Sequence, residues 1–213
     1  MRNLVLALGL VTSVASGAFA APVTVIALGD SLTQGYGLPV EDGFVPQLER
    51  WLVAKGHDVR VQNAGVSGDT TAGGLSRVGW SLAEGGQAMI VTLGGNDLLR
   101  GIDPKVSRAN LDAILTEAAG RGIKVLLVAM EAPGNYGPDY RAEFDAIYPD
   151  LAAKHAVLLA ESFLKPLVRG QDDIRVMREF MQADGIHPNA DGVARIVESL
   201  GPRVVELIGL VGK

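Results

Sequence analysis

Short apolar runs alternate with longer helical segments along the chain, and this alternation constrains the fold more than any other feature. Five such runs, rich in Val, Ile and Leu, occupy residues 23–28, 58–62, 88–93, 124–129 and 156–159. The runs are continuous rather than alternating with polar residues, which is typical of strands buried on both faces of a parallel sheet. We therefore predict about five parallel strands.

The segments between these runs carry helical signals. They span about residues 43–55, 72–84, 104–121, 138–154 and 190–208. In the first segment the apolar residues Phe44, Leu48, Trp51 and Leu52 recur at the spacing of one helix face. Regular alternation of strand and helix predicts an α/β fold, a three-layer α/β/α sandwich with right-handed crossovers and a flavodoxin-like strand order.

The first 20 residues have the pattern of an export signal. Arg2 supplies a positive charge, an uncharged apolar segment runs from Leu4 to about Ser16, and residues 18–20 form a small-x-small cleavage site. A membrane anchor is the alternative, but the apolar run is shorter than the roughly 20 residues that a spanning helix needs. We expect cleavage before Ala21, one domain over residues 21–213, no integral membrane segment after cleavage, and an exported protein, periplasmic or secreted.

Composition argues against several classes of protein. The chain has no cysteine, which rules out disulfides, thiolate chemistry and cysteine metal sites. Its formal net charge is −5 at pH 7, so a nucleic-acid partner is not expected. Neither the G-x-S-x-G nucleophile elbow of the α/β-hydrolases nor a Walker A phosphate loop occurs.

A serine follows the first predicted strand in the stretch ALGDSLTQG. Ser31 either caps a helix or is a nucleophile exposed at the carboxyl edge of the sheet, where ligands of parallel α/β sheets bind. Segments of small and polar residues follow other predicted strands at 63–70 and 94–97, and another, at 183–192, precedes the last helix. These segments are expected to share that edge with Ser31.

The position of each histidine relative to the predicted strands distinguishes His187 from His57 and His155. His57 and His155 each precede a predicted strand, so both are expected at the opposite edge of the sheet as surface residues. His187 follows the last strand and is the histidine that can act as a base toward Ser31. A lone histidine at this edge makes a poor metal site, and no metal is expected.

Further residues complete a site for acyl transfer. Asp184, three residues before His187, can accept the Nδ1–H of the histidine and leave Nε2 to take the serine proton. The alternative is that Asp184 is a loop carboxylate without a catalytic role. The backbone N–H groups of Ser31 and Gly68 and the side-chain amide of Asn96 can donate to an oxyanion. The alternative is that Gly68 and Asn96 are ordinary turn residues without a catalytic role.

Three aspartates fall within the same segments. We interpret Asp30, Asp69 and Asp97 as structural acceptors for backbone N–H groups in short loops, rather than as metal ligands or general acids. Because Asp30 adjoins Ser31, its side chain is expected to point away from the site.

Four of these segments resemble the signature blocks of one known family. GDSL at 29–32, GVSGDT at 65–70, GGND at 94–97 and DGIHP at 184–188 are similar, in order and spacing, to the four blocks of the SGNH (GDSL) hydrolases. The resemblance is to the exported bacterial subgroup of arylesterases and multifunctional thioesterase/lysophospholipases. It implies Ser31 as nucleophile, His187 as base and Asp184 as its orienting partner.

The same resemblance implies Gly68 and Asn96 as oxyanion donors beside the Ser31 amide, and it implies no cofactor. The expected function is hydrolysis of small-molecule aryl or acyl esters, with thioesters and lysophospholipids as further substrates, through an acyl-enzyme. Six residues are expected either to line an apolar pocket for the acyl or aryl group or simply to pack on the core: Leu98, Leu99, Met130, Pro133, Tyr136 and Tyr140. Two alternatives stay open, a carbohydrate or peptidoglycan O-acetylesterase with the same triad and a non-catalytic flavodoxin-like binding module.

Overall fold

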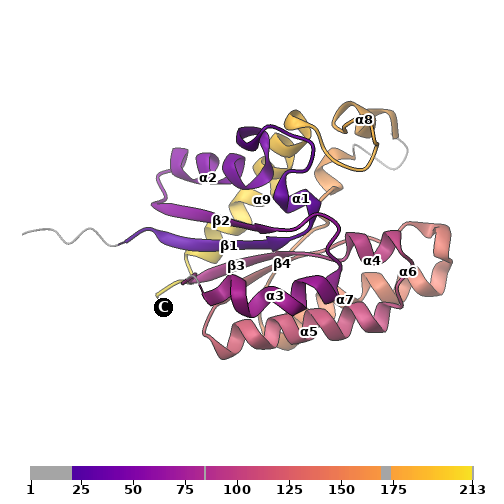
Figure 1. Ribbon diagram of the computed structural model, residues 1–213, viewed down its shortest axis with the longest axis horizontal. Coiled ribbons are helices and arrows are strands. Elements are labelled where there is room, and N and C mark those ends of the chain that lie inside the picture. Colours follow the sequence, from indigo (N-terminus) through magenta and orange to yellow (C-terminus); the bar gives the residue numbers. More distant parts are fainter. Residues whose placement is uncertain (1–20, 84, 169–173, 213) are drawn as a thin grey trace, which may run out of the picture.

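The computed structural model describes residues 21–83, 85–168 and 174–212 (Figure 1). The predicted export signal falls on residues 1–20, which lie outside the described residues. Among the described residues, no helix combines the length and the apolar character needed to cross a bilayer.

A five-stranded parallel sheet forms the middle layer. Its strands stand in the order β2-β1-β3-β4-β5, which is the flavodoxin-like order, and every neighbouring pair is parallel. The strands are β1 (Val23–Gly29), β2 (Val59–Gly65), β3 (Ala88–Thr92), β4 (Lys124–Val128) and β5 (Leu158–Ala160). The predicted number, direction and order of strands are confirmed.

Helices cover both faces of the sheet and complete the predicted sandwich (Figure 1). One face carries α2 (Phe44–Ala54) and α9 (Ala190–Ile208), and the other carries α3 (Thr71–Ala83), α5 (Pro104–Gly120) and α7 (Ile147–His155). Shorter helices follow strand ends or join longer elements: α1 (Ser31–Gln34), α4 (Gly95–Leu99), α6 (Pro138–Asp145), α8 (Ile174–Glu179), and the 3₁₀ turns Val40–Asp42, Gly134–Tyr136 and Lys165–Leu167.

Burial follows the position of each strand in the sheet. All residues of the central strand β3 are buried, as expected for a strand covered on both faces. The edge strand β2 instead alternates, with Val59 and Val61 buried and Arg60 exposed. Continuous burial is therefore confirmed for the central strands and wrong for β2, because an edge strand is covered less completely.

Two strand boundaries differ from the prediction by two residues or more, and the others agree to within one residue. Strand β2 continues to Gly65, three residues beyond the predicted end, because residues 63–65 pair in parallel with the last three residues of β1. Strand β5 begins at Leu158 because Ala156 has a left-handed backbone, φ 50°, and ends α7 instead of starting the strand.

The single helix predicted over residues 138–154 is wrong. The chain forms α6 and α7, with a break at Ala146. Pro149 explains the break, because it has no N–H to donate to the carbonyl of Asp145 and its ring would clash with that carbonyl in a continuous helix. The side chain of Asp145, next to the break, accepts the backbone N–H of Ala132 at 2.8 Å.

Candidate active site

The predicted nucleophile lies at the carboxyl end of β1, as the first residue of α1. Asp30 is the N-cap of this helix, with its Oδ1 3.0 Å from the Leu32 N. The interpretation of Ser31 as the cap is therefore wrong, and its half-buried side chain is left for another partner. Close packing fixes this turn: a Cβ on Gly29 would lie 2.0 Å from Thr33 Oγ1.

Ser31, His187 and Asp184 form one hydrogen-bonded chain. Nε2 of His187 lies 2.9 Å from Ser31 Oγ, and Nδ1 lies 2.6 Å from Asp184 Oδ2. Asp184 also accepts the backbone N–H groups of Ile186 and His187 through Oδ1. The side-chain hydrogen bond from His187, followed by these backbone bonds, lowers the pKa of Asp184 to about 2. The ionised carboxylate favours the tautomer with a proton on Nδ1, which leaves Nε2 able to accept the serine proton.

A compact turn before α9 holds the histidine in place. Met181 and Pro188 form an antiparallel bridge, and the backbone N–H of Gln182 donates to the His187 carbonyl at 2.7 Å. The Gln182 side chain donates to the carbonyls of Tyr36 and Pro188. The turn that carries His187 is therefore attached to the segment after α1, so base and serine are positioned together.

The predicted oxyanion donors border the same cleft as Ser31. Gly68 follows β2 with φ +83°, a left-handed conformation that favours glycine. Asn96 is half-buried in α4, and its Nδ2 donates to the Asp69 carbonyl at 2.9 Å and lies 3.3 Å from Asp30 Oδ2. The structure thus brings together the backbone of Ser31 and Gly68 and the side chain of Asn96.

The three aspartates have structural contacts, but not all of the expected kind. Asp97 is fully buried and accepts the backbone N–H and hydroxyl of Thr71 as well as the Ser107 hydroxyl. Asp69 pairs with the side chain of Arg77 instead of a backbone N–H. Asp30 accepts a backbone N–H as expected, but it also borders the cleft beside Asn96, so the expectation that it points away is wrong.

Asp30 is 2 % exposed, and burial raises its pKa from 3.8 to about 6 against the opposing hydrogen bonds from Leu32 and Asn96. A carboxyl whose pKa is raised on folding stabilises the fold most when protonated, and this contribution is lost as the pH rises through about 6. The shift corresponds to about 3 kcal/mol.

We therefore expect D30N, whose asparagine can still cap α1, to exceed the wild type in free energy of unfolding at pH 8 by about 1–3 kcal/mol. Well below pH 3.8 the two proteins should agree, because Asp30 is then protonated in both the folded and unfolded states. Urea unfolding at a series of pH values measures the difference. A wild-type protein that is the more stable of the two at pH 8 would contradict this assignment of cost to the buried carboxylate.

A cleft of about 1160 Å³ opens beside Ser31 and His187. Five of the six predicted apolar residues line it: Leu98, Leu99, Met130, Pro133 and Tyr136. Tyr140 does not, because its hydroxyl donates to the Ile102 carbonyl at 2.8 Å and its ring packs between Tyr136 and Phe144. These large side chains form an apolar wall of the cleft beside Ser31 and His187. Tyr140 instead anchors the loop behind this wall.

The other two histidines lie away from this edge. His57 precedes β2, as predicted. His155 ends α7, but the expectation that it is a surface residue is wrong, since its side chain is only 11 % exposed. Its Nε2 lies 2.6 Å from Oδ1 of Asp112, a carboxylate that Lys154 also binds. His155 therefore joins α7 to α5.

Sequence reasoning missed several residues that hold the site. The Gln34 side chain accepts the Ser67 backbone N–H, and Arg100 donates to the Gly68 carbonyl at 2.8 Å. The ring of Tyr36 packs against that of His187 with centroids 4.7 Å apart. Gln34 and Tyr36 adjoin the GDSL stretch, which could have marked them, but their partners lie more than 30 residues away and no local pattern indicates the pairing.

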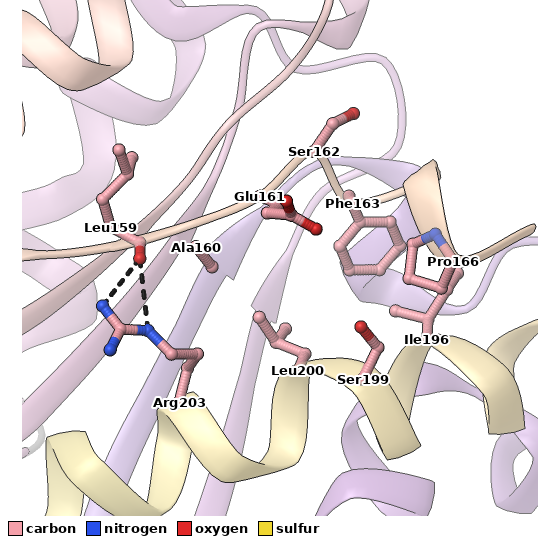
Figure 2. A pocket seen from close by; sticks show the side chains of 10 residues that line it. All are labelled: Leu159, Ala160, Glu161, Ser162, Phe163, Pro166, Ile196, Ser199, Leu200 and Arg203. Carbon is pink, nitrogen blue, oxygen red and sulfur yellow. Dashed lines mark hydrogen bonds between the residues drawn. The ribbon is translucent and has the colours of Figure 1, made fainter. Parts of the chain in front are cut away.

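A second, smaller cavity of about 220 Å³ lies between the end of β5 and α9 (Figure 2). Figure 2 shows the Arg203 guanidinium directed at the Leu159 carbonyl, which accepts from its Nη2 at 2.8 Å. The cavity contains none of the predicted site residues. Among the residues that the structure describes, no cluster of three or more acidic or histidine side chains could hold a metal ion.

Known proteins share both the sequence and the fold. Residues 27–195 match the GDSL-like Lipase/Acylhydrolase family. The chain is 39% identical over 190 residues to Esterase TesA of Pseudomonas aeruginosa, covering 89% of this chain and 91% of that protein. It is 34% identical over 191 residues to Thioesterase 1/protease 1/lysophospholipase L1 of Escherichia coli K12, covering 89% and 86%. The structure of the psychrotrophic esterase EstA from Pseudoalteromonas sp., inhibited by monoethylphosphonate, superposes with a TM-score of 0.79 at 28% identity, covering 87% and 98%.

Proposed function

The chain belongs to the GDSL-like lipase/acylhydrolase family and is an ester hydrolase, and from this premise we propose that it acts through an acyl-enzyme on Ser31. The observation that carries the proposal is the hydrogen-bonded chain from Ser31 Oγ through His187 to Asp184. A serine hydroxyl needs an adjacent base to become nucleophilic, and a base held by a carboxylate meets that need.

The reaction then has two matched steps. Ser31 Oγ attacks the ester carbonyl while His187 Nε2 takes its proton, and the oxyanion is held by the Ser31 and Gly68 backbone N–H groups and the Asn96 amide. His187 returns the proton to the leaving alcohol as the carbonyl re-forms. Water repeats the sequence on the acyl-enzyme, with His187 as base, and releases the acid and free Ser31.

The cleft supports an acyl or aryl ester as substrate. Its walls are mainly apolar, and its volume of about 1160 Å³ exceeds what an acetyl group would fill. The relatives are named for esterase, thioesterase and lysophospholipase activities, so we propose that thioesters and lysophospholipids are also substrates.

A substrate panel on the purified protein tests this proposal. We expect p-nitrophenyl esters of medium chain length to be hydrolysed with higher kcat/KM than the acetate, and an alkyl phosphonate to abolish the activity. A steep preference for acetylated sugars or peptidoglycan would instead assign an O-acetylesterase. No hydrolysis by the folded protein on any ester would assign a non-catalytic binding module.

Replacement of the proposed side-chain oxyanion donor gives a further prediction. We expect N96A to lower kcat for a p-nitrophenyl ester by about 10²–10³-fold with KM little changed, because its amide acts mainly when charge develops on the oxygen. The matched control is N135A, since Asn135 borders the same cleft and should change kcat by less than about threefold. Equal kcat values for N96A and the wild type would remove Asn96 from the oxyanion hole.

We propose that residues 1–20 are an export signal that is cleaved before Ala21, so that the enzyme works in the periplasm or outside the cell. The charged start, the short apolar segment and the small-x-small site support this. Amino-terminal sequencing of the protein from fractionated cells tests it. A cytoplasmic protein that begins at Met1 would contradict it.

A further inference from the structure

Arg77, in the second turn of α3, binds three groups at the carboxyl edge of the sheet with one guanidinium. Its Nε donates to Asp69 Oδ2 at 2.6 Å, its Nη1 to the Ala64 carbonyl at 2.7 Å and its Nη2 to the Gly29 carbonyl at 2.8 Å. The Arg77 and Asp69 side chains are only 21 % and 19 % exposed. Three donors of a planar, rigid fork are thus directed at three separate acceptors.

The three acceptors lie on the two segments that carry the proposed catalytic groups Ser31 and Gly68. The Gly29 carbonyl lies at the end of β1, two residues before Ser31. Ala64 lies near the end of β2, and Asp69 directly follows Gly68, whose N–H is a proposed oxyanion donor. One side chain therefore connects the turn of the nucleophile to the loop of the oxyanion donor.

Close packing makes this connection stiff. The Gly29 carbonyl also accepts the Val66 backbone N–H at 3.0 Å, so both β1 and the loop after β2 meet at this oxygen. A Cβ on Gly73 would lie 2.5 Å from Asp69 Oδ1, which shows how tightly the carboxylate packs on the first turn of α3. Neither Asp69 nor Arg77 can move far without displacing the other.

We propose that Arg77 is a positioning residue for catalysis, which sets the Gly68 N–H relative to Ser31 so that both address the same oxyanion. This inference rests on the proposed function. Arg77 does not line the cleft beside Ser31 and acts through the two segments that it joins. Because a displacement of about 1 Å in a catalytic group can cost about 10²-fold in rate, loss of Arg77 should reduce kcat more than substrate binding.

The control is Arg203, which makes the same kind of contact elsewhere in the fold. From α9 it donates through Nε and Nη2 to the Leu159 carbonyl of β5 (Figure 2). Its side chain is 37 % exposed and also pairs with Glu206. The R203A substitution therefore removes a hydrogen bond between a helix and a strand at β5. Strands β3 and β4 separate β5 from β1, the strand that precedes Ser31. R203A should lower stability without lowering kcat.

The test compares R77A, R77K and R203A with the wild type on a p-nitrophenyl ester. We expect R77A to lower kcat about 10–100-fold, with KM within about threefold, and to slow inactivation by a phosphonate ester by a similar factor. R77K should also lose at least about tenfold, because one ammonium cannot satisfy the three acceptors of the fork. R203A should keep kcat within about threefold of the wild type.

Chemical rescue separates positioning from general loss of structure. Ethylguanidine added at millimolar concentrations should restore kcat of R77A at least fivefold and leave R203A unchanged. Wild-type kcat in folded R77A, an equal loss of kcat in R203A, or no rescue of R77A would each overturn the proposal. If R77A does not fold, R77K decides alone, and a wild-type kcat in that variant overturns the proposal.

S31A is measured in the same series so that the two proposals can fail separately. An active S31A would end the proposed function. An inactive S31A beside a fully active R77A would end only the role of Arg77.

Discussion

S31A is expected to lower kcat for a p-nitrophenyl ester by about 10⁶-fold, to a residual rate that still exceeds the uncatalysed one. The expected loss is this large because the hydroxyl that forms the acyl-enzyme is removed and water has no positioned substitute. The residual rate comes from the oxyanion donors and the cleft, which the substitution leaves in place. Steady-state hydrolysis by wild type and variant, purified in parallel, measures the ratio.

The matched control for this prediction is S162A. Ser162 borders the same cleft, on the segment after β5, and should change kcat by less than about threefold. Circular dichroism and thermal unfolding of S31A should remain close to the wild type, since the Ser31 side chain is only half-buried. A folded S31A with more than one tenth of the wild-type kcat would exclude Ser31 as the nucleophile.

H187A is expected to lower kcat by a similar factor of about 10⁶, because the serine hydroxyl is a weak nucleophile without its base. The double variant S31A/H187A should be no less active than either single variant, since the two groups act as one unit. D184N should lose about 10⁴-fold, because an asparagine can favour the wrong histidine tautomer while preserving the shape of the site. The same hydrolysis assay gives all three ratios.

H155A supplies the control for removal of a histidine. Its imidazole lies at the opposite edge of the sheet and joins α7 to Asp112 on α5, so we expect a loss of stability with kcat close to the wild type. Additive losses in the S31A/H187A double variant would show that the serine and the histidine act independently, which the hydrogen bond of 2.9 Å between them contradicts.

Much of the fold could be predicted because its signals are local. Continuous apolar runs such as that of β3 mark strands covered on both faces, and the alternation of strand and helix limits the connections to right-handed crossovers. A parallel sheet then places residues that follow strands at one edge. That rule alone was enough to separate His187 from His155 and to group Ser31 with Asn96.

The remaining features depend on contacts between distant segments. The break between α6 and α7 could have been predicted from Pro149, whose missing N–H is a local property. The partly buried position of His155 could not, because it depends on Asp112, 43 residues away. Nothing in the sequence near Arg77 indicates that its side chain reaches Gly29, 48 residues earlier.

Asp30 shows how such contacts change chemistry as well as structure. Its position before Ser31 identified a turn residue, and the structure adds that burial raises its pKa to about 6. This raised pKa follows from the packing of α1 and α4 around the Asp30 carboxyl, beside Asn96. No single segment of the chain specifies that packing.

Labelling with a p-nitrophenyl alkylphosphonate tests the central claim most directly, since the reagent stops at the covalent step. Intact mass and peptide mapping of the inactivated protein should show one phosphonyl group per chain on Ser31, with one equivalent of p-nitrophenol released. H187A should react slower by several orders of magnitude. A phosphonyl group on any other residue, or complete inactivation with Ser31 unmodified, would contradict the account.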